Sequence, residues 1–237
     1  MHRIRTGVVV ACGLVLLGTA SAAGQGAAGT DAPVASAAQF DALARLARDR
    51  LHRALLIGEE DEEARRPLLV EAEGYARAAA ELRPDEADGW FLLAAAMGLR
   101  SEYESMRQQV RMGAEIWQFA ATALERDPDH AGAHHVMGRL NLEAMELSGI
   151  GRMIATHLFG SQMLRQASWE QAAWHLERAA ELEPEALYHH LWLARLHRAR
   201  DRDDEARAHL RVIVDSPARS ALDEIWIREA REDLEDL

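Results

Sequence analysis

Apolar residues recur every three or four positions from residue 40 onward, which is the period of an amphipathic α-helix. Between Phe40 and Leu56 these apolar residues are separated by Arg and Asp. The acidic run 59–63 interrupts the pattern, and a second helix follows until Pro84 ends it. The folded part of the chain is therefore expected to begin near Ser36 with a pair of helices.

Three later segments align with one another without gaps: YARAAAELRPDEADGWFLLAAAMG, FAATALERDPDHAGAHHVMGRLN and HLERAAELEPEALYHHLWLARLH. Each contains the Ala-bearing end of one helix, a Pro and the start of the next helix. One helical hairpin cannot bury its own apolar faces, so such a period predicts hairpins stacked into a solenoid. The small residues expected to let the two helices of a hairpin approach closely are Ala94, Gly138 and Ala194.

This pattern resembles the tetratricopeptide repeat, in which a bulky residue, Leu and a small residue are followed on the partner helix by Ala, an aromatic or Leu, Ala and Pro. The resemblance implies an all-α, tetratricopeptide-repeat-like α-solenoid of stacked helix-turn-helix pairs with a C-terminal capping helix. The repeat units are expected at about 36–86, 87–130, 131–186 and 187–237.

The third unit carries an apolar insertion around residues 142–168, which contains the segment EAMELSGIGRMIATHLFG. The histidine-containing helix before it and SWEQAAWHLERAAELEP after it resemble the regulator-of-microtubule-dynamics group of tetratricopeptide proteins and its bacterial relatives. Ala155, Phe159 and Gly160 match that family's Ala-x-x-x-Phe-Gly element. Animal members associate with microtubules, but an acidic chain without Lys departs from that setting, so only the fold is carried over. The insertion is expected to pack as a lid, with an exposed docking patch as the alternative.

The N-terminal residues have the pattern of a secretory signal. Arg3 and Arg5 precede an apolar run at 8–17, and small residues follow at 19–23. We expect residues 1–22 to be a signal peptide and residues 23–35 a flexible linker. The protein is then periplasmic or secreted, with no stable membrane span after cleavage. A retained N-terminal anchor and a lipoprotein attached through Cys12 are the alternatives.

Composition excludes several classes of function. The 237 residues carry a net charge of −12 and contain no Lys, so nucleic-acid binding through phosphate neutralisation is not expected. The single Cys excludes a disulfide framework and a Cys-based zinc site. No metalloprotease, P-loop, dinucleotide-binding or nucleophile-elbow motif occurs, so we expect no enzyme activity, no catalytic residue and no cofactor.

Histidines and acidic clusters are the remaining candidates for chemistry. His134 and His190 stand at the bulky packing position that Trp90 fills in the first aligned segment, so we expect them to pack rather than to bind metal. A metal site would also need three or four convergent ligands. The acidic runs 59–63 and 201–205 are expected in solvated loops, whereas a general acid needs a buried carboxyl group.

We therefore expect a non-enzymatic scaffold that binds a protein or peptide in the concave groove formed by the first helices. Arg139 and Arg195, one repeat apart, could grip a carboxylate bidentately, unless Arg139 pairs with Glu143 one helical turn later. A self-assembling homo-oligomeric subunit and a histidine-based metal-binding protein or enzyme are the alternatives. In such repeats the second, fifth and ninth residues of the first helix face the groove, which selects as groove residues Phe91, Ala95, His135, Arg139, Tyr188, Leu191 and Arg195.

Overall fold

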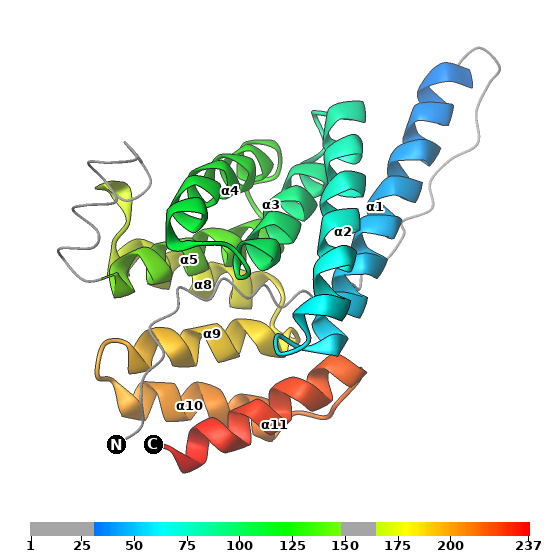
Figure 1. Cartoon of the computed structure of the whole chain (residues 1–237). Helices are drawn as coiled ribbons and strands as arrows, with labels where there is room; N and C mark the ends of the chain where they lie inside the picture. The colour runs from blue at the N-terminus through cyan, green and yellow to red at the C-terminus, as the bar shows by residue number, and fades with distance from the viewer. Residues whose placement is uncertain (1–30, 148–164) are drawn as a thin grey trace.

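A computed structural model of the chain describes residues 31–147 and 165–237, with side chains from residue 36 onward. These described residues form nine α-helices and no β-strand (Figure 1). The helices are α1 (Asp31–Ile57), α2 (Glu62–Leu82), α3 (Ala87–Ser101), α4 (Met106–Arg126), α5 (Ala131–Glu146), α8 (Trp169–Leu182), α9 (Leu187–Arg198), α10 (Asp203–Val214) and α11 (Ala221–Glu235).

The helices pair along the chain as hairpins. α1 packs with α2, α3 with α4, α5 with α8, and α9 with α10. Contacts between α2 and α3, α4 and α5, and α8 and α9 join each hairpin to the next, and α11 packs on α10 at the C-terminal end. The expected all-α solenoid with a C-terminal capping helix is therefore confirmed. The insertion element of Ala155, Phe159 and Gly160 lies outside the described residues.

Close packing within a hairpin depends on small residues, as the sequence predicts. A side-chain carbon added at Gly138 of α5 would lie 2.6 Å from Cγ of Leu176 on α8. Ala94 and Ala194, at the equivalent positions of α3 and α9, are fully buried. Two helices can approach this closely only where one of them carries almost no side chain at the crossing.

A second repeated position joins the two helices of a hairpin through aromatic rings. In each of these hairpins a ring on the first helix contacts a ring on the second helix. Two of the second-helix residues, Phe119 and His175, occupy equivalent positions, because each lies nine residues before a Pro. His134 and His190 therefore occupy the packing position expected for them. The three contacts are Trp90 with Phe119 at 5.8 Å between ring centroids, His134 with His175 at 5.1 Å, and His190 with His209 at 5.4 Å.

The solenoid closes on itself. Its inner layer consists of the first helices of the hairpins and the capping helix, and each contacts the next in the order α1, α3, α5, α9, α11 and back to α1. Leu55 of α1 packs against the apolar cluster of α9, α10 and α11. Figure 1 shows α11 reaching the end of the hairpin formed by α1 and α2. The inner faces of these helices consequently face protein rather than an open groove.

The starts of three helices differ from the sequence expectations. α1 begins at Asp31, inside the segment expected to be a linker, because a Pro at position 33 is tolerated in the first turn of a helix. Glu62 and Glu63 lie in the first turn of α2, and the acids 203–205 lie in the first turn of α10, rather than in loops. Their negative charges stabilise these helix starts by interacting with the positive end of the helix dipole. All of them are exposed to solvent, as expected.

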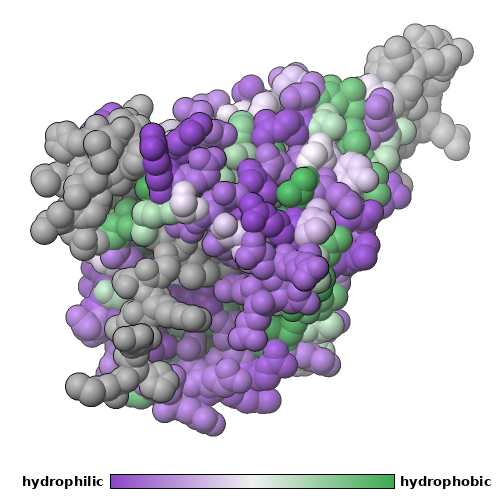
Figure 2. All heavy atoms as spheres, viewed as in Figure 1, coloured by the Kyte–Doolittle hydropathy of each residue, from purple (hydrophilic) through white to green (hydrophobic). Residues whose placement is uncertain are grey.

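The visible surface is mainly hydrophilic, with hydrophobic residues gathered toward the side of α1 and α2 (Figure 2). In the part of the chain that the structure describes, no helix combines the length and apolar character needed to cross a bilayer. Residues 1–30, which include the expected signal peptide, lie outside that part.

Candidate binding site

The groove residues lie on α3, α5 and α9, but the structure buries almost all of them. Six have between 0 and 5% of their surface exposed, and only Arg195 is partly exposed. The expectation that all of them line an open groove is therefore wrong for this closed arrangement. The cause is the contact of the inner helices around the ring, which fills the concave side with side chains. The six buried residues are Phe91, Ala95, His135, Arg139, Tyr188 and Leu191.

Phe91 illustrates this correction. Its ring lies 4.6 Å from the ring of His130, between centroids, at the start of α5. A side-chain carbon added at Gly132 would lie only 2.4 Å from the tip of the Phe91 ring. Phe91 thus packs one hairpin on the next instead of facing a ligand.

Arg139 is held by two partners in the interior. Its Nη2 donates to Oε1 of Glu143 at 3.0 Å, one turn further along α5. Its guanidinium carbon lies 3.9 Å from the centre of the Trp192 ring on α9. The sequence analysis left open that Arg139 pairs with Glu143 instead of gripping a ligand carboxylate, and this pairing is confirmed.

Arg195 meets the same ring from α9 itself. Its guanidinium carbon lies 4.6 Å from the centre of the Trp192 ring, and its Nη2 forms an ion pair with Oε1 of Glu229 on α11. Both members of this ion pair are about one-third exposed. The two arginines therefore converge on one aromatic ring, and each carries a carboxylate partner from the chain. A guanidinium group over a Trp ring is a favourable cation–π arrangement.

His135 completes the constellation. Its Nδ1 lies 3.0 Å from Nδ1 of His189, and its ring packs edge-on against Tyr188 at 4.7 Å and Trp192 at 6.2 Å between centroids. Sequence reasoning missed Trp192 and His189. The helical period could have found Trp192, because it lies four residues after Tyr188 and one turn before Arg195.

Burial controls the protonation of this site. It raises the pKa of Glu143 to about 7, although Arg139 pulls that pKa down. Burial also lowers the pKa of His135 well below its usual value, and the charges of His189, Arg139 and Arg195 act in the same direction. His135 is consequently neutral at physiological pH, while Glu143 titrates close to it.

A second buried ion pair lies beside the first. Arg65 of α2 donates from Nη1 to Oε2 of Glu102 at 2.9 Å and to the hydroxyl oxygen of Tyr103 at 3.0 Å. Burial raises the pKa of Glu102 well above its usual value, Arg65 opposes that rise, and Arg139 and Glu143 also act on it. The two Arg–Glu pairs therefore form one buried electrostatic network between α2, α3 and α5.

A comparison with protein families covers all of these helices. Residues 30–237 match the family model described as regulator of microtubule dynamics protein 1-3. The chain belongs to this family. The family match therefore spans every described helix and begins one residue before α1, and it agrees with the resemblance that the insertion suggested. No curated protein matches the chain.

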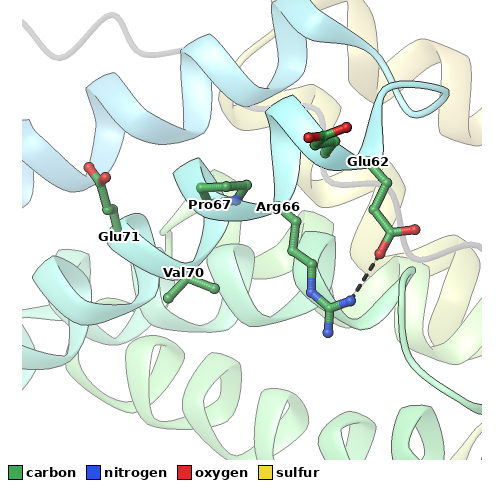
Figure 3. A pocket seen from close by; sticks show the side chains of 6 residues that line it. Glu62, Arg66, Pro67, Val70 and Glu71 are labelled. Carbon is green, nitrogen blue, oxygen red and sulfur yellow. Dashed lines mark hydrogen bonds and ion pairs between the residues drawn. The ribbon is translucent and has the colours of Figure 1, made fainter.

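A hollow of about 740 Å³ lies along α2 of this family member (Figure 3). Its residues include Pro67 and Val70, of which Val70 is 54% exposed, and four charged side chains, three of which have ion-pair partners. Arg66, for example, donates to Glu62 at 2.9 Å. The hollow therefore brings together apolar side chains and charged side chains that are mostly paired.

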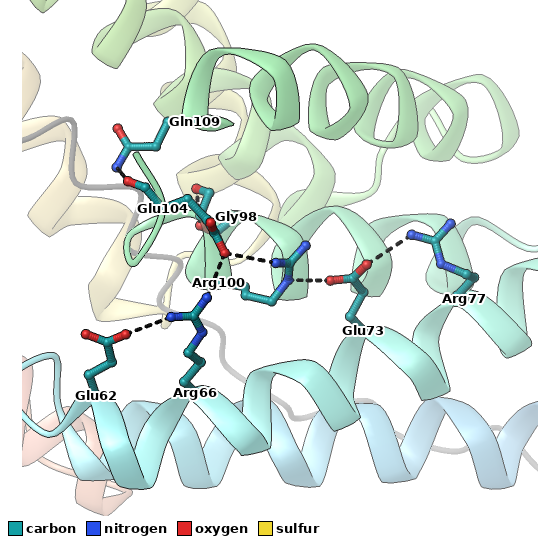
Figure 4. Close-up of polar contacts among 9 residues, drawn as sticks. Glu62, Arg66, Glu73, Arg77, Gly98, Arg100, Glu104 and Gln109 are labelled. Atoms are coloured by element: carbon teal, nitrogen blue, oxygen red, sulfur yellow. Dashed lines mark hydrogen bonds and ion pairs between the residues drawn. The ribbon is translucent and has the colours of Figure 1, made fainter. Parts of the chain in front are cut away.

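Charged side chains of α2 take part in a series of ion pairs, here called the ladder, that joins α2 to α3 and to the turn after α3 (Figure 4). Glu104 accepts from Arg66 at 3.0 Å and from Arg100 at 3.3 Å, and Arg100 donates in turn to Glu73 at 2.6 Å. Each carboxylate lies between two guanidinium groups, so the ladder fixes the two helices against each other. Its role is structural, because every one of these charges is satisfied by another.

Across residues 31–147 and 165–237 of this family member, no group of three or more His, Cys, Asp and Glu side chains could hold a metal ion. His130, which precedes α5, serves as its N-cap by accepting from the backbone N–H of Ala133 at 3.2 Å. Its Nε2 contacts Oδ1 of Asp88 at 3.2 Å. His130 therefore joins α5 to α3.

Proposed function

We propose that this protein is a non-enzymatic scaffold of the tetratricopeptide type that binds an acidic segment of a protein or peptide. The proposed entry point is the edge between α9 and α11, where Arg195 lies over Trp192. The observation that carries the proposal is the convergence of Arg139 and Arg195 on this ring. One arginine is buried and fixed, and the other is accessible.

Glu229 supports an acidic ligand, because it already presents a carboxylate to Arg195 from α11. An ion pair that is one-third exposed contributes roughly 0–1 kcal/mol, so a ligand carboxylate could replace Glu229 at little cost. Trp192 is buried, with 6% of its surface exposed, so its ring would position the Arg195 guanidinium group rather than contact the ligand. An acidic segment whose carboxylate takes the place of Glu229 fits this arrangement.

The test is affinity capture from native extract with the full chain as bait. Arg195→Glu should lose the partner, because it reverses the charge of the accessible guanidinium group. The matched control is Arg198→Glu, since Arg198 lies on the same helix and pairs with Asp233 of α11 at 3.0 Å. Arg198 has no ring contact with Trp192 among the described residues, so this control should keep the partner.

Each variant loses one ion pair between α9 and α11, and Arg195→Glu also loses its cation–π contact with Trp192, so its melting temperature should be equal to or slightly below that of Arg198→Glu. The proposal fails if the two variants and the wild type capture the same proteins in the same amounts. Equal loss of capture in both variants would also contradict it, because disruption of α11 rather than loss of the Arg195 contact would then be the cause.

Self-association is a second candidate, supported by exposed apolar side chains on α1 and α2. Leu46, Leu56 and Ile57 are each 39% exposed, and Val70 is 54% exposed. Burial of this edge between two copies would remove apolar surface from water. Sedimentation velocity over a hundredfold concentration range tests the idea, and a constant monomer coefficient would refute it.

We also propose export to the periplasm or the extracellular space, on the basis of the charged, apolar and small-residue regions at 1–23. N-terminal sequencing of protein made in its source cell provides the test. A mature chain that starts at residue 23 or 24 supports cleavage, whereas a chain that still contains Arg3 and Arg5 contradicts it.

A further inference from the structure

Three pairs of histidines link the helices of the C-terminal half through facing ring nitrogens. Each Nδ1 lies within hydrogen-bond distance of the Nδ1 of its partner. A neutral imidazole has one N–H and one bare nitrogen, so one ring of each pair donates and the other accepts. The pairs are His134 with His175 at 2.9 Å (α5 to α8), His135 with His189 at 3.0 Å (α5 to α9), and His190 with His209 at 3.1 Å (α9 to α10).

The direction of the first hydrogen bond follows from the surroundings of His134. Its Nε2 lies 2.9 Å from the carbonyl oxygen of Pro128. A carbonyl oxygen only accepts, so Nε2 carries the hydrogen and Nδ1 is bare. His175 therefore donates from its Nδ1 to the bare Nδ1 of His134, which is neutral.

The second pair is the most deeply buried. Nε2 of His189 lies 3.5 Å from Oε2 of Glu183, but neither it nor Nε2 of His135 has a hydrogen-bond partner among the described residues. The only hydrogen bond of these two rings with each other therefore joins their Nδ1 atoms, one of which donates and the other accepts.

We propose that these three histidine pairs form an acid-sensitive lock: near neutral pH each pair shares one hydrogen and joins two helices, and acid adds protons that force the helices apart. A first added proton can be held between two rings as N–H⁺···N. A second proton leaves two N–H groups facing each other at about the same distance, with two positive charges and no acceptor.

Charges around the central pair oppose even the first proton. The guanidinium groups of Arg139 on α5 and Arg195 on α9 both face His135, together with the neutral rings of Tyr188 and Trp192. Burial lowers the pKa of His189, and only Glu183 pulls it upward. Positive charge at this site is therefore disfavoured by both burial and its neighbours.

The outer pairs behave in the same way. Burial lowers the pKa of His175 to about 4, with His134 adding to the shift. Burial also lowers the pKa of His209 to about 4, and His190 and His197 add to it. Burial lowers the pKa of His134 and His190 as well. The charged or titratable groups around these two rings are Arg178, Asp129 and His130 for His134, and His189 for His190.

The sign of the pH effect follows from these shifts. A histidine whose pKa is lower in the folded chain than its ordinary value of about 6.5 takes up a proton on unfolding. Its stabilising effect is complete above that value and is lost as the pH falls toward 4. Glu143 and Glu102 act in the opposite sense, because burial raises their pKa values and acid favours the folded form. Only a comparison of histidine variants separates the two contributions.

The lock has a defined location. Among the described residues, no histidine pair of this kind joins α1, α2, α3 and α4. Acid should therefore loosen α5, α8, α9 and α10 first, while the N-terminal hairpins keep their packing. Because Trp192 and Arg139 lie between α5 and α9, this loosening would expose the inner face that is closed at neutral pH.

The test compares urea unfolding at pH 7.5 and pH 5.0 for the full chain and for the double variant His135→Asn, His189→Asn. Asparagine amides keep one hydrogen bond and do not titrate in this range. Each proton taken up on unfolding raises the unfolding constant by up to about tenfold per pH unit. The wild-type midpoint should fall at pH 5.0, and the double variant should lose a large part of that fall. The control, His52→Asn on α1, should behave as the wild type.

Hydrogen exchange and ring titration keep the proposal testable if the double variant does not fold. In wild-type protein, amides of α9 should exchange faster at pH 5.0 than at pH 7.5, after correction for intrinsic rates, relative to amides of α3. NMR should show the paired rings protonating at lower pH than free histidine in the same tube. The proposal is overturned if the wild type and the folded double variant have parallel pH dependences, or if the paired rings titrate together with free histidine.

Discussion

The substitution Gly138→Ala tests the helix contact on which the hairpin of α5 and α8 depends. The added carbon would lie 2.6 Å from Cγ and 2.9 Å from Cδ2 of Leu176, and 3.0 Å from its backbone nitrogen. Leu176 is completely buried, so its side chain has no free space into which it can move. The backbone nitrogen also limits how far a change of rotamer can relieve the contact.

Two effects of opposite sign decide the result. Replacing Gly by Ala inside a helix stabilises the helix by about 1 kcal/mol. Overpacking a core costs about 1–3 kcal/mol. We therefore expect Gly138→Ala to lower the free energy of unfolding by up to about 2 kcal/mol. Gly74→Ala on α2 is the matched control, because no atom lies within 4 Å of the added carbon and Gly74 is exposed. It should raise the free energy of unfolding by about 0.5–1 kcal/mol.

Urea unfolding followed by tryptophan fluorescence gives both values. The two variants should differ by about 0.5–3 kcal/mol, where each 1 kcal/mol corresponds to roughly 2–4 °C in melting temperature for a chain of this size. In the double variant Gly138→Ala, Leu176→Ala, the loss caused by Leu176→Ala should be smaller than in the wild type by about 0.5–3 kcal/mol, because the shortened side chain relieves the clash. Equal stabilisation by the two single substitutions would show that α5 and α8 do not cross at Gly138.

Two further predictions concern buried and partly buried charges. Arg65→Met should lower the free energy of unfolding by about 3–5 kcal/mol, because Glu102 is left buried without its ion-pair partner. Adding Glu102→Gln to this variant should recover part of the lost stability in urea unfolding, and no recovery would argue against the ion pair. Burial pushes the pKa of Asp88 up, but the hydrogen bond with His130 and the charge of Arg48 lower it to about 2. The stability that Asp88 supplies is therefore present above pH 4 and lost as the pH falls to 2. Asp88→Asn should flatten that part of the pH–stability curve by under about 1 kcal/mol, since Asp88 is 41% exposed.

The hairpins could be predicted because the sequence marks their ends directly. A residue before Pro is disfavoured in the helical conformation, so a helix usually stops just ahead of it. α2, α4 and α8 end at Leu82, Arg126 and Leu182, and each of these residues lies two positions before a Pro. The spacing of Ala94, Gly138 and Ala194 then shows which face of each first helix meets its partner.

The closure of the solenoid could not be predicted in the same way. Its curvature is the sum of small rotations between successive hairpins, and each rotation depends on how side chains interlock between neighbouring hairpins. Contacts such as that of Phe91 with Gly132 set these rotations, but they do not alter the periodic pattern along the chain. Except for Arg195, the residues at positions two, five and nine therefore lie buried at contacts between helices, and this burial could not be predicted from the periodic pattern.

The local part of the site was more predictable than its long-range part. The pairing of Arg139 with Glu143 follows from their spacing of four on one helix. The meeting of Arg139 and Arg195 at Trp192 joins two different hairpins, so it depends on the same rotations that close the ring. The Arg195–Glu229 ion pair depends on the place of α11, which belongs to none of the aligned segments.

The closed ring makes the two proposals separable by pH. If an acidic partner binds at the edge, Arg195 alone is sufficient, and Arg195→Glu should abolish capture at pH 7.5, where the histidine pairs are intact. If the partner needs the inner face, capture should be weak at pH 7.5 and should increase near pH 5, where the lock is loosened. Replacement of His135 and His189 by Asn would then make capture less dependent on pH, while Arg198→Glu would leave it unchanged. Tight capture at pH 7.5 that is lost in Arg195→Glu and falls at pH 5 would place the binding site at the outer edge and would leave the inner face with a structural role.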